Sequence, residues 1–296
     1  MQYSINGKKY IFNNKVRENK DVRLSFDELS QKIFGLSFEN WYQNGYWTEK
    51  YLPYVLLDGK RVVSNVSANI MDTVWKNEKK RYIQLGTVMT DSEYRQQGLS
   101  RFLIGQVIEE WKEKCDAIYL FANDTVLDFY PKFGFVKAEE YQYQIAVLPK
   151  PKHVRKLDMS SENDRELLLA KYKNSNPFSA LPMIDQTGLL MFYCTQFMKD
   201  DVYYAKDCDA IVIKKQNGKD LICYDIFCSE RNDINEVLSI ISKHDTTNVV
   251  LGFSPKSTAN CKAKRLREED TTLFVLSDKE TIFADNQLMF PLLSHA

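Results

Sequence analysis

The chain has 296 residues, of which 44% are hydrophobic, and its 40 lysine and arginine residues balance 40 aspartate and glutamate residues. This length is sufficient for two domains with cores of their own. The zero formal net charge gives no electrostatic reason to expect nucleic acid or an anionic membrane as a partner. No apolar run approaches the length of a membrane span, and residues 1–9 lack the apolar core of a signal peptide, so a cytoplasmic location is expected.

The first elements are predicted from a cap and a turn. Ser25, followed three residues later by Glu28, matches a capping box and predicts that a helix starts there. Further on, Asp58-Gly59 joins the apolar runs 51–57 and 61–67, which predicts a β-hairpin.

Aromatic residues crowd the segment between the predicted helix and the hairpin. They either line a pocket for a cationic or aromatic amine through cation–π contacts or belong to the core. The residues concerned are Trp41, Tyr42, Tyr46, Trp47, Tyr51 and Tyr54.

A strand, a polar loop and a helix are predicted next. The interior Gly86 of the strand 81–88 is a poor strand former and indicates a bulge or a close backbone approach. The loop Arg95-x-x-Gly98-x-Ser100 then leads into an apolar helix. Free N–H groups at a helix start can bind a pyrophosphate without a metal. The loop lacks the lysine of a Walker motif and two glycines of a dinucleotide fingerprint.

The following strand, 117–121, is succeeded by a second distinctive segment. Asn123 is a capping residue that opens a predicted helix, and Gly134 closes it. The segment contains Tyr130 and ends in Gly134-Phe135.

Both segments resemble motifs of the GNAT family, the acetyltransferases that bind acetyl-coenzyme A. The loop is similar to the signature Arg/Gln-x-x-Gly-x-Gly/Ala, and the second segment to the hallmark Tyr-x-x-x-Gly-Phe. The resemblance implies an α/β GNAT (acyl-CoA N-acyltransferase) fold with a mixed, splayed sheet. It also implies that the protein is an acyltransferase, which transfers acetyl from acetyl-CoA to a primary amine of a small molecule or peptide.

The resemblance further implies roles for individual residues. Tyr130 would stand near the coenzyme sulfur as general acid, whereas the residues alone favour a half-buried tyrosine that packs on the sheet. Asn123 would contact the pantetheine arm or cap the helix. Ser100 replaces the usual Gly or Ala, but its small side chain still permits close approach. The residues expected at acetyl-CoA are Val88, Thr90, Arg95, Gln96, Gln97, Gly98, Leu99, Ser100 and Asn123.

No general base can be named from the sequence. Asp91, Asp72 and Glu139 lie near predicted strand ends, although each is more often a surface charge, and a water chain is another route for the proton. A further hypothesis is that the apolar segment 288–296 brings a terminal carboxylate into the cleft, in which case deleting residues 294–296 should abolish turnover and leave coenzyme affinity intact. No metal is expected, because the cysteines and histidines show no ligand spacing.

The second half is predicted to repeat the first in outline. Residues 149–153, with two prolines, predict a linker between a GNAT acetyl-CoA-binding catalytic domain, 1–148, and a degenerate GNAT-like domain, 154–296. The expected elements are a helix at 163–173, a hairpin turning at Asn217-Gly218, a helix at 233–243 and a strand at 248–253.

The repeat lacks the phosphate loop. Residues 228–233 contain no glycine and two acids, so coenzyme binding is assigned to the first half only. The second half would shape the acceptor pocket, support the first or form a homodimer. The alternative functions are a non-catalytic acyl-CoA sensor and transfer of a longer acyl group.

Overall fold

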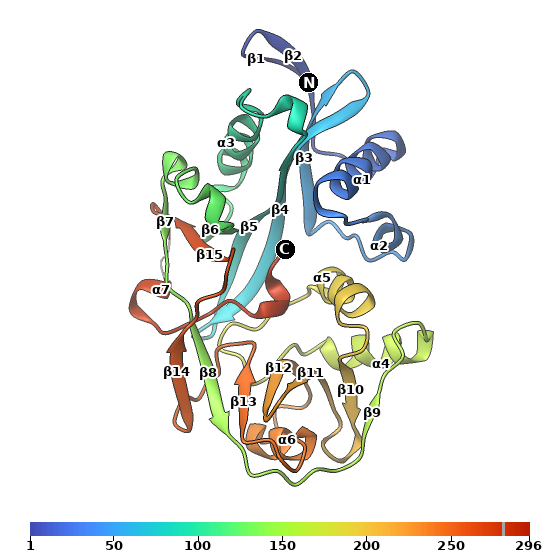
Figure 1. Cartoon of the computed structure of the whole chain (residues 1–296), viewed down its shortest axis with the longest axis vertical. Helices are drawn as coiled ribbons and strands as arrows, with labels where there is room; N and C mark the ends of the chain where they lie inside the picture. Colours follow the sequence, from blue (N-terminus) through green and yellow to red (C-terminus); the bar gives the residue numbers. More distant parts are fainter. Residues whose placement is uncertain (280–281) are drawn as a thin grey trace.

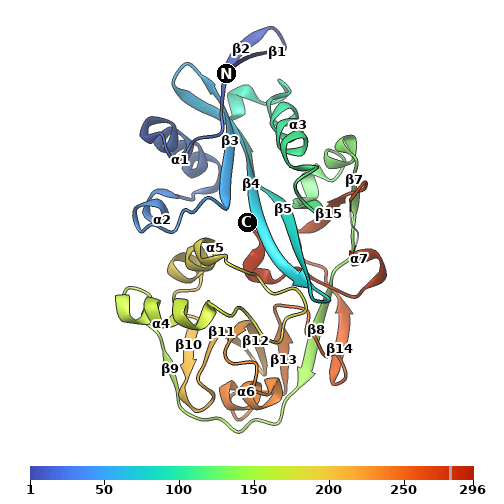
Figure 2. The same ribbon diagram turned by 180° about the vertical axis from the view of Figure 1, so that it is seen from behind.

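Two mixed β-sheets and their covering helices make up the part of the chain that the computed structural model describes, residues 1–279 and 282–296. The first sheet lies in the upper part of Figure 1 and the second in the lower part, and the C-terminus lies beside the first sheet where the two units meet. The reverse view in Figure 2 shows the same arrangement. The mixed α/β class expected from the sequence is confirmed.

The first sheet is built around long antiparallel strands, followed by one parallel pair. Its order is β1 (Gln2–Ile5), β2 (Lys8–Asn13), β3 (Tyr51–Asp58), β4 (Arg61–Trp75), β5 (Glu78–Thr90), β6 (Ala117–Ala122), β15 (Thr272–Leu276) and β7 (Phe135–Lys137). The predicted hairpin is confirmed as β3 and β4, with Gly59 at φ 61° in the turn. The pair β5 and β6 is parallel.

Helices cover both faces of this sheet. Helix α3 (Leu99–Trp111) packs on the face that carries Tyr54 and Val66, whereas α1 (Lys20–Phe34) packs on the face that carries Val55 and Met89. Because successive residues of a strand point to opposite faces, β3 and β4 are buried on both sides.

The predicted start of α1 at Ser25 is wrong. The helix begins at Lys20, where the Asn19 side chain accepts a hydrogen bond of 3.2 Å from the N–H of Val22. Ser25 lies inside the helix and its hydroxyl accepts from the N–H of Val62, 2.9 Å away. The Ser25 hydroxyl therefore accepts from a backbone N–H of β4 and not from an N–H at the start of its own helix.

The second sheet has the order β14 (Cys261–Arg265), β8 (Tyr141–Ala146), β13 (Asn248–Leu251), β12 (Asp220–Phe227), β11 (Ala210–Asn217), β10 (Val202–Ala205) and β9 (Val154–Lys156). The predicted hairpin turning at Asn217-Gly218 is confirmed as β11 and β12. Strands β12 and β13 are parallel, and α6 (Ile234–Ile241) connects them. The predicted helix at 163–173 is confirmed as α4 (Glu162–Tyr172).

The two halves exchange strands. Strand β15, from the second half, pairs with β6 and β7 in the first sheet. Strand β8, from the first half, pairs with β13 and β14 in the second sheet. A division of the chain at residues 148–154 therefore separates two strands from the sheets to which they belong.

The other helical segments are short. They are α2 (Glu39–Gln43), α5 (Thr187–Phe192), α7 (Ile282–Asp285), η1 (Ser92–Tyr94), η2 (Asp124–Val126), η3 (Tyr130–Phe133), η4 (Tyr193–Phe197), η5 (Lys206–Cys208) and η6 (Leu292–Ser294). Among the described residues, no helix is long and apolar enough to cross a membrane.

Candidate active site

The first sheet opens between β5 and β6. The two strands pair only as far as Leu85 and Leu120; beyond this point β5 continues along β4, and β6 along β15. A bulge marks the place, because Thr87 and Val88 of β5 lie opposite the single residue Val66 of β4. The bulge predicted at Gly86 is thus confirmed in the adjoining residues.

The phosphate loop follows β5. Gln96 and Gly98 have positive φ of 61° and 80°, and Gly98 is the residue immediately before α3. None of the backbone N–H groups from Gln96 to Arg101 donates a hydrogen bond to another described residue. The loop thus presents free donors at the positive end of a helix, which suits the pyrophosphate of a coenzyme A molecule.

Side chains hold this loop in place. Ser100 and Thr90 share a hydrogen bond of 2.8 Å between their hydroxyls, and Arg95 Nε lies 3.4 Å from the Thr90 carbonyl oxygen. Gln97 accepts hydrogen bonds of 2.8 Å at its carbonyl oxygen and its side-chain oxygen, from Asn6 and Tyr10 of the β1–β2 hairpin. Of the predicted coenzyme residues, Leu99 is fully buried, so only its backbone faces the loop.

The predicted helix from Asn123 to Gly134 is wrong, because η2 and η3 occupy this segment instead. Their bonds run from Val126 N–H to the Asn123 carbonyl and from Gly134 N–H to the Pro131 carbonyl, which is the tighter three-residue spacing. Pro131 cannot donate to a helix, and the Asn123 side chain makes no cap. Gly134 ends the segment at φ 89°.

Tyr130 is the first residue of η3, and its side chain is buried in the core. Its ring packs against Phe129, Phe135 and Phe274. Burial raises the pKa of Tyr130 to about 12, so the phenol is protonated at neutral pH. A general acid requires this protonation state.

A cavity of about 230 Å³ lies on the face of the sheet opposite α3. Both halves of the chain line it, with Trp41, Tyr51 and Met71 from the first half and Leu189 and Phe192 from the second. No acidic side chain is among the described residues that line it.

The aromatic residues of the predicted pocket are divided between cavity and core. Trp41 and Tyr51 line the cavity, whereas Trp47 is buried in the cluster behind it. Tyr54 lies on the opposite face of the sheet, where its hydroxyl donates to Glu110 over 2.8 Å.

The C-terminal segment enters the same cavity. A backbone oxygen of Ala296 lies 3.4 Å from Gln84 Nε2, and a Cβ at Gly86 would collide with this oxygen. The close backbone approach predicted at Gly86 is therefore also observed. His295 stacks on Phe121 with ring centroids 3.8 Å apart, and its backbone oxygen accepts a hydrogen bond of 2.5 Å from Tyr193.

The carboxylates considered as bases are engaged elsewhere. Burial opposes ionisation of Asp91, yet Lys32 and Arg61 hold its pKa below the ordinary value. Asp72 shows the same balance, with Arg81 and Lys50 lowering its pKa. Ion-paired carboxylates of this kind are weak bases.

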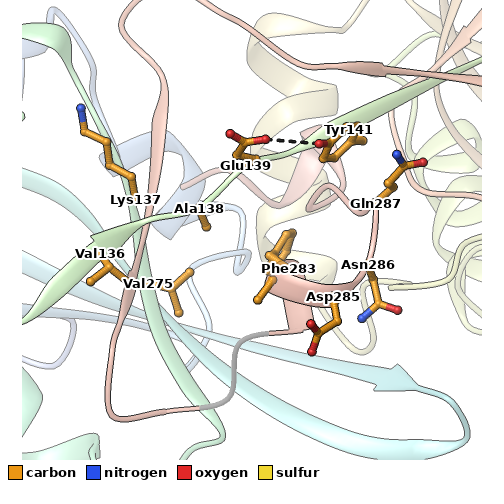
Figure 3. Close-up of a pocket in the computed structure, with 11 residues that line it drawn as sticks. Val136, Lys137, Ala138, Glu139, Tyr141, Val275, Phe283, Asp285, Asn286 and Gln287 are labelled. Atoms are coloured by element: carbon orange, nitrogen blue, oxygen red, sulfur yellow. Dashed lines mark hydrogen bonds between the residues drawn. The ribbon is translucent and has the colours of Figure 1, made fainter.

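Glu139 lies at a different hollow of about 410 Å³ between β7 and α7 (Figure 3). It accepts a hydrogen bond of 3.2 Å from the Tyr141 hydroxyl, and Arg265 lies 2.6 Å away. This hollow shares no described residue with the cavity that holds Ala296.

The open sheet and the loop of free N–H groups at the start of α3 form a site that suits an acyltransferase, and a comparison with known families supports this class. Residues 19–138 match the family model of the acetyltransferase (GNAT) domain. The match shows an acetyltransferase (GNAT) domain in this part of the chain.

Solved structures show the same fold over 90% of this chain. A conserved protein from Enterococcus faecalis V583 has 14% identity and a TM-score of 0.62 over 72% of its chain. Eis1 from Mycobacterium abscessus has 12% identity and a TM-score of 0.56 over 73%. A GCN5-related N-acetyltransferase from Kribbella flavida has 15% identity and a TM-score of 0.54 over 71%. No curated protein sequence matches the chain.

Proposed function

We propose that this protein transfers the acetyl group of acetyl-CoA to the primary amine of a small molecule or peptide. The observation that carries the proposal is the loop Gln96–Arg101, whose free N–H groups lie beside the opening between β5 and β6. The cavity on the other face of the sheet supplies a place for the amine. Coenzyme and acceptor would then meet at the opening.

The chemical roles follow from what amide formation requires. The amine must lose a proton, negative charge on the thioester oxygen must be stabilised and the leaving thiolate must gain a proton. We assign the last role to Tyr130 and the second to backbone near Val88. For the first, a carboxylate carried by Ala296 would lie at the cavity beside Gly86.

The second half is proposed to be a degenerate copy. Strands β11, β12 and β13 with α6 follow the same sequence of antiparallel and parallel pairings as β4, β5 and β6 with α3. Its contribution would be to the acceptor side, because α5 and the C-terminal segment line the cavity.

Calorimetry with acetyl-CoA tests the coenzyme site. Gly98→Glu places a side chain where φ is 80° and a negative charge near the phosphates, so binding should be lost. Gly218→Glu is the matched control, because Gly218 also has positive φ, 57°, but lies in the β11–β12 turn. It should bind like the wild type.

Thiol release with a panel of amines then tests turnover. Release with any primary amine supports N-acetyl transfer. Binding without release would favour the acyl-CoA sensor, and release only with longer acyl donors would favour the other transferase. If wild type does not bind acetyl-CoA, the proposed function fails.

A further inference from the structure

Thr87 has an unusual conformation at the centre of the proposed site. It lies in the bulge of β5 with φ of 47°, in the left-handed region that β-branched residues rarely adopt. Thr87 is among the residues that line the cavity. Backbone strain of this kind gathers at functional sites, where the surrounding structure maintains it.

A chain of buried hydrogen bonds leads to this side chain. Asn65 Nδ2 donates to the Thr87 carbonyl oxygen over 2.8 Å and to Ser67 Oγ over 3.0 Å. Ser67 Oγ donates to the Tyr51 hydroxyl over 3.1 Å, and this hydroxyl lies 2.9 Å from Thr87 Oγ1. Asn65, Ser67 and Tyr51 are all buried.

The direction of the chain is fixed at its first member. A carbonyl oxygen only accepts, so the Asn65 atom that faces Thr87 must be the nitrogen. Ser67 Oγ therefore accepts a hydrogen bond from Asn65 and donates its own to the Tyr51 hydroxyl. The Tyr51 hydroxyl in turn donates to Thr87 Oγ1. Burial also raises the pKa of Tyr51, which keeps it a donor.

The remaining proton is that of Thr87 itself. Its hydroxyl makes no other hydrogen bond to the described residues, and it lines the cavity at the point where β5 leaves β6. An oxygen that already accepts from Tyr51 is a better donor, because successive hydrogen bonds polarise one another. The site thus holds a directed side-chain donor at the sheet opening.

We propose that Thr87 is a catalytic residue whose hydroxyl donates a hydrogen bond to the thioester oxygen of acetyl-CoA. This proposal rests on the proposed function. The amine lone pair forms the new C–N bond while negative charge gathers on the thioester oxygen, and the C–S bond then breaks with its electron pair on sulfur. The amine proton goes to the base and the thiolate is protonated by the general acid. Thr87 keeps its own proton throughout.

Three variants at this position separate the hydroxyl from the backbone. Thr87→Ala and Thr87→Gly remove the donor, and kcat should fall about 100-fold in both, the usual effect of losing one oxyanion donor. Thr87→Ser retains the donor without the branched carbon and should keep most of the activity. Affinity for acetyl-CoA, measured by calorimetry, should change little in all three.

Two readouts do not depend on turnover. The infrared carbonyl band of bound acetyl-CoA should move to higher frequency in Thr87→Ala and stay in place in Thr87→Ser. Thr87→Gly should melt at a higher temperature than Thr87→Ala, because only glycine adopts the positive φ without strain. Lys76→Gly is the matched control, since Lys76 has φ of 49° in the β4–β5 turn and glycine there should leave kcat unchanged.

The relay has its own test. Tyr51→Phe should lower kcat less than Thr87→Ala, and the double variant should be no worse than Thr87→Ala alone. Additive losses of kcat in the double variant would show that Tyr51 does not act through Thr87. Full activity of Thr87→Ala, or a change only in the KM for the amine, would overturn the catalytic role of Thr87. The proposed function would still stand if the wild type is active.

Discussion

Glu140 is a carboxyl group buried where the two sheets meet. Its side-chain oxygen accepts a hydrogen bond of 2.8 Å from the N–H of Phe290, so it anchors the segment that leads to Ala296. Burial, with a smaller contribution from Glu268, raises the pKa of Glu140 to about 8. The group is therefore protonated in the folded protein at neutral pH.

This raised pKa predicts a loss of stability with rising pH. Below pH 4.5 the carboxyl is protonated in both the folded and the unfolded chain. Between pH 4.5 and about 8 only the unfolded chain loses the proton, so the free energy of unfolding falls as the pH rises. Above about 8 both states are ionised, and the loss of unfolding free energy stays constant.

Glu140→Gln keeps an acceptor for Phe290 without the titration. Urea unfolding should show the variant more stable than the wild type above pH 8, and this advantage should vanish below pH 4.5. Burial also raises the pKa of Asp225, to about 7, but that contribution is common to both proteins. An unchanged pH dependence of stability in Glu140→Gln would contradict the prediction.

Residues with purely local signals were predictable, and residues that depend on distant partners were not. The sequence around Gly98 and Gly134 predicts turns with positive φ, and both glycines have positive φ in the structure. Thr87 carries no such signal, because its positive φ is imposed by the bulge and by Asn65 on the neighbouring strand. Nothing in the sequence near Ser25 indicates that its hydroxyl accepts a hydrogen bond from the N–H of Val62.

At the level of elements, the β1–β2 hairpin supports the phosphate loop. Asn6 at the hairpin turn and Tyr10 both hydrogen-bond to Gln97, and Tyr3 packs on Phe102 of α3 with centroids 4.8 Å apart. A loop that is ordered before binding loses less conformational freedom when the coenzyme arrives.

Loosening the hairpin should therefore weaken coenzyme binding. Asn6→Gly tolerates the φ of 48° and removes the side chain, and Tyr10→Phe removes the hydroxyl. Each lost hydrogen bond should cost about 1 kcal/mol of acetyl-CoA binding free energy by calorimetry. Tyr3→Phe is the control, because among the described residues that hydroxyl hydrogen-bonds only to Met1, at the surface. Unchanged affinity in both variants would show that the hairpin does not order the loop.

Hairpins and the crossover helices were predictable because their signals lie within one short stretch. The helix expected at 123–134 failed because Pro131 and the apolar surroundings favour two tight turns over a continuous helix. The pairing of β6 with β15 joins residues far apart in the chain, and no local pattern specifies it.

For the whole molecule, the cavity between the two halves would determine which amines fit the proposed acceptor site. Its 230 Å³ lie between the roughly 150 Å³ that hold a benzene ring and the roughly 300 Å³ of the smallest drug-sized pockets. Lys50, the one lysine among the described residues of its wall, is already paired with Asp72 and Asp185. The walls thus offer apolar contact and few charges for a second ammonium group.

Small monoamines with an aromatic or branched apolar body should accordingly be the best acceptors. Their kcat/KM should exceed that of polyamines, aminoglycosides and lysine peptides in thiol-release assays. Phe197→Asp, at an exposed position of the cavity rim, should improve the relative rate with diamines. A polyamine as best acceptor of the wild type would contradict the prediction.

The strand exchange predicts that neither half folds alone. A chain ending at residue 148 lacks β15, so the outer edge of β6 would be unpaired and the apolar residues Leu273 and Phe274 of β15 would be missing from the core. Such a chain should be insoluble or unfolded, and the complete protein should unfold in urea in one transition. Two separate transitions, or a folded fragment, would show that the sheets are independent.

The position of β15 also sets a condition on biosynthesis. The chain is synthesised from its N-terminus, so the outer edge of β6 stays unpaired until Thr272–Leu276 has been made. Between the synthesis of β6 and that of β15 the nascent chain therefore carries an unprotected β-edge, which is a surface prone to pair with other chains. The proposed acetyl-transfer site can mature only after residues 272–276 have left the exit tunnel.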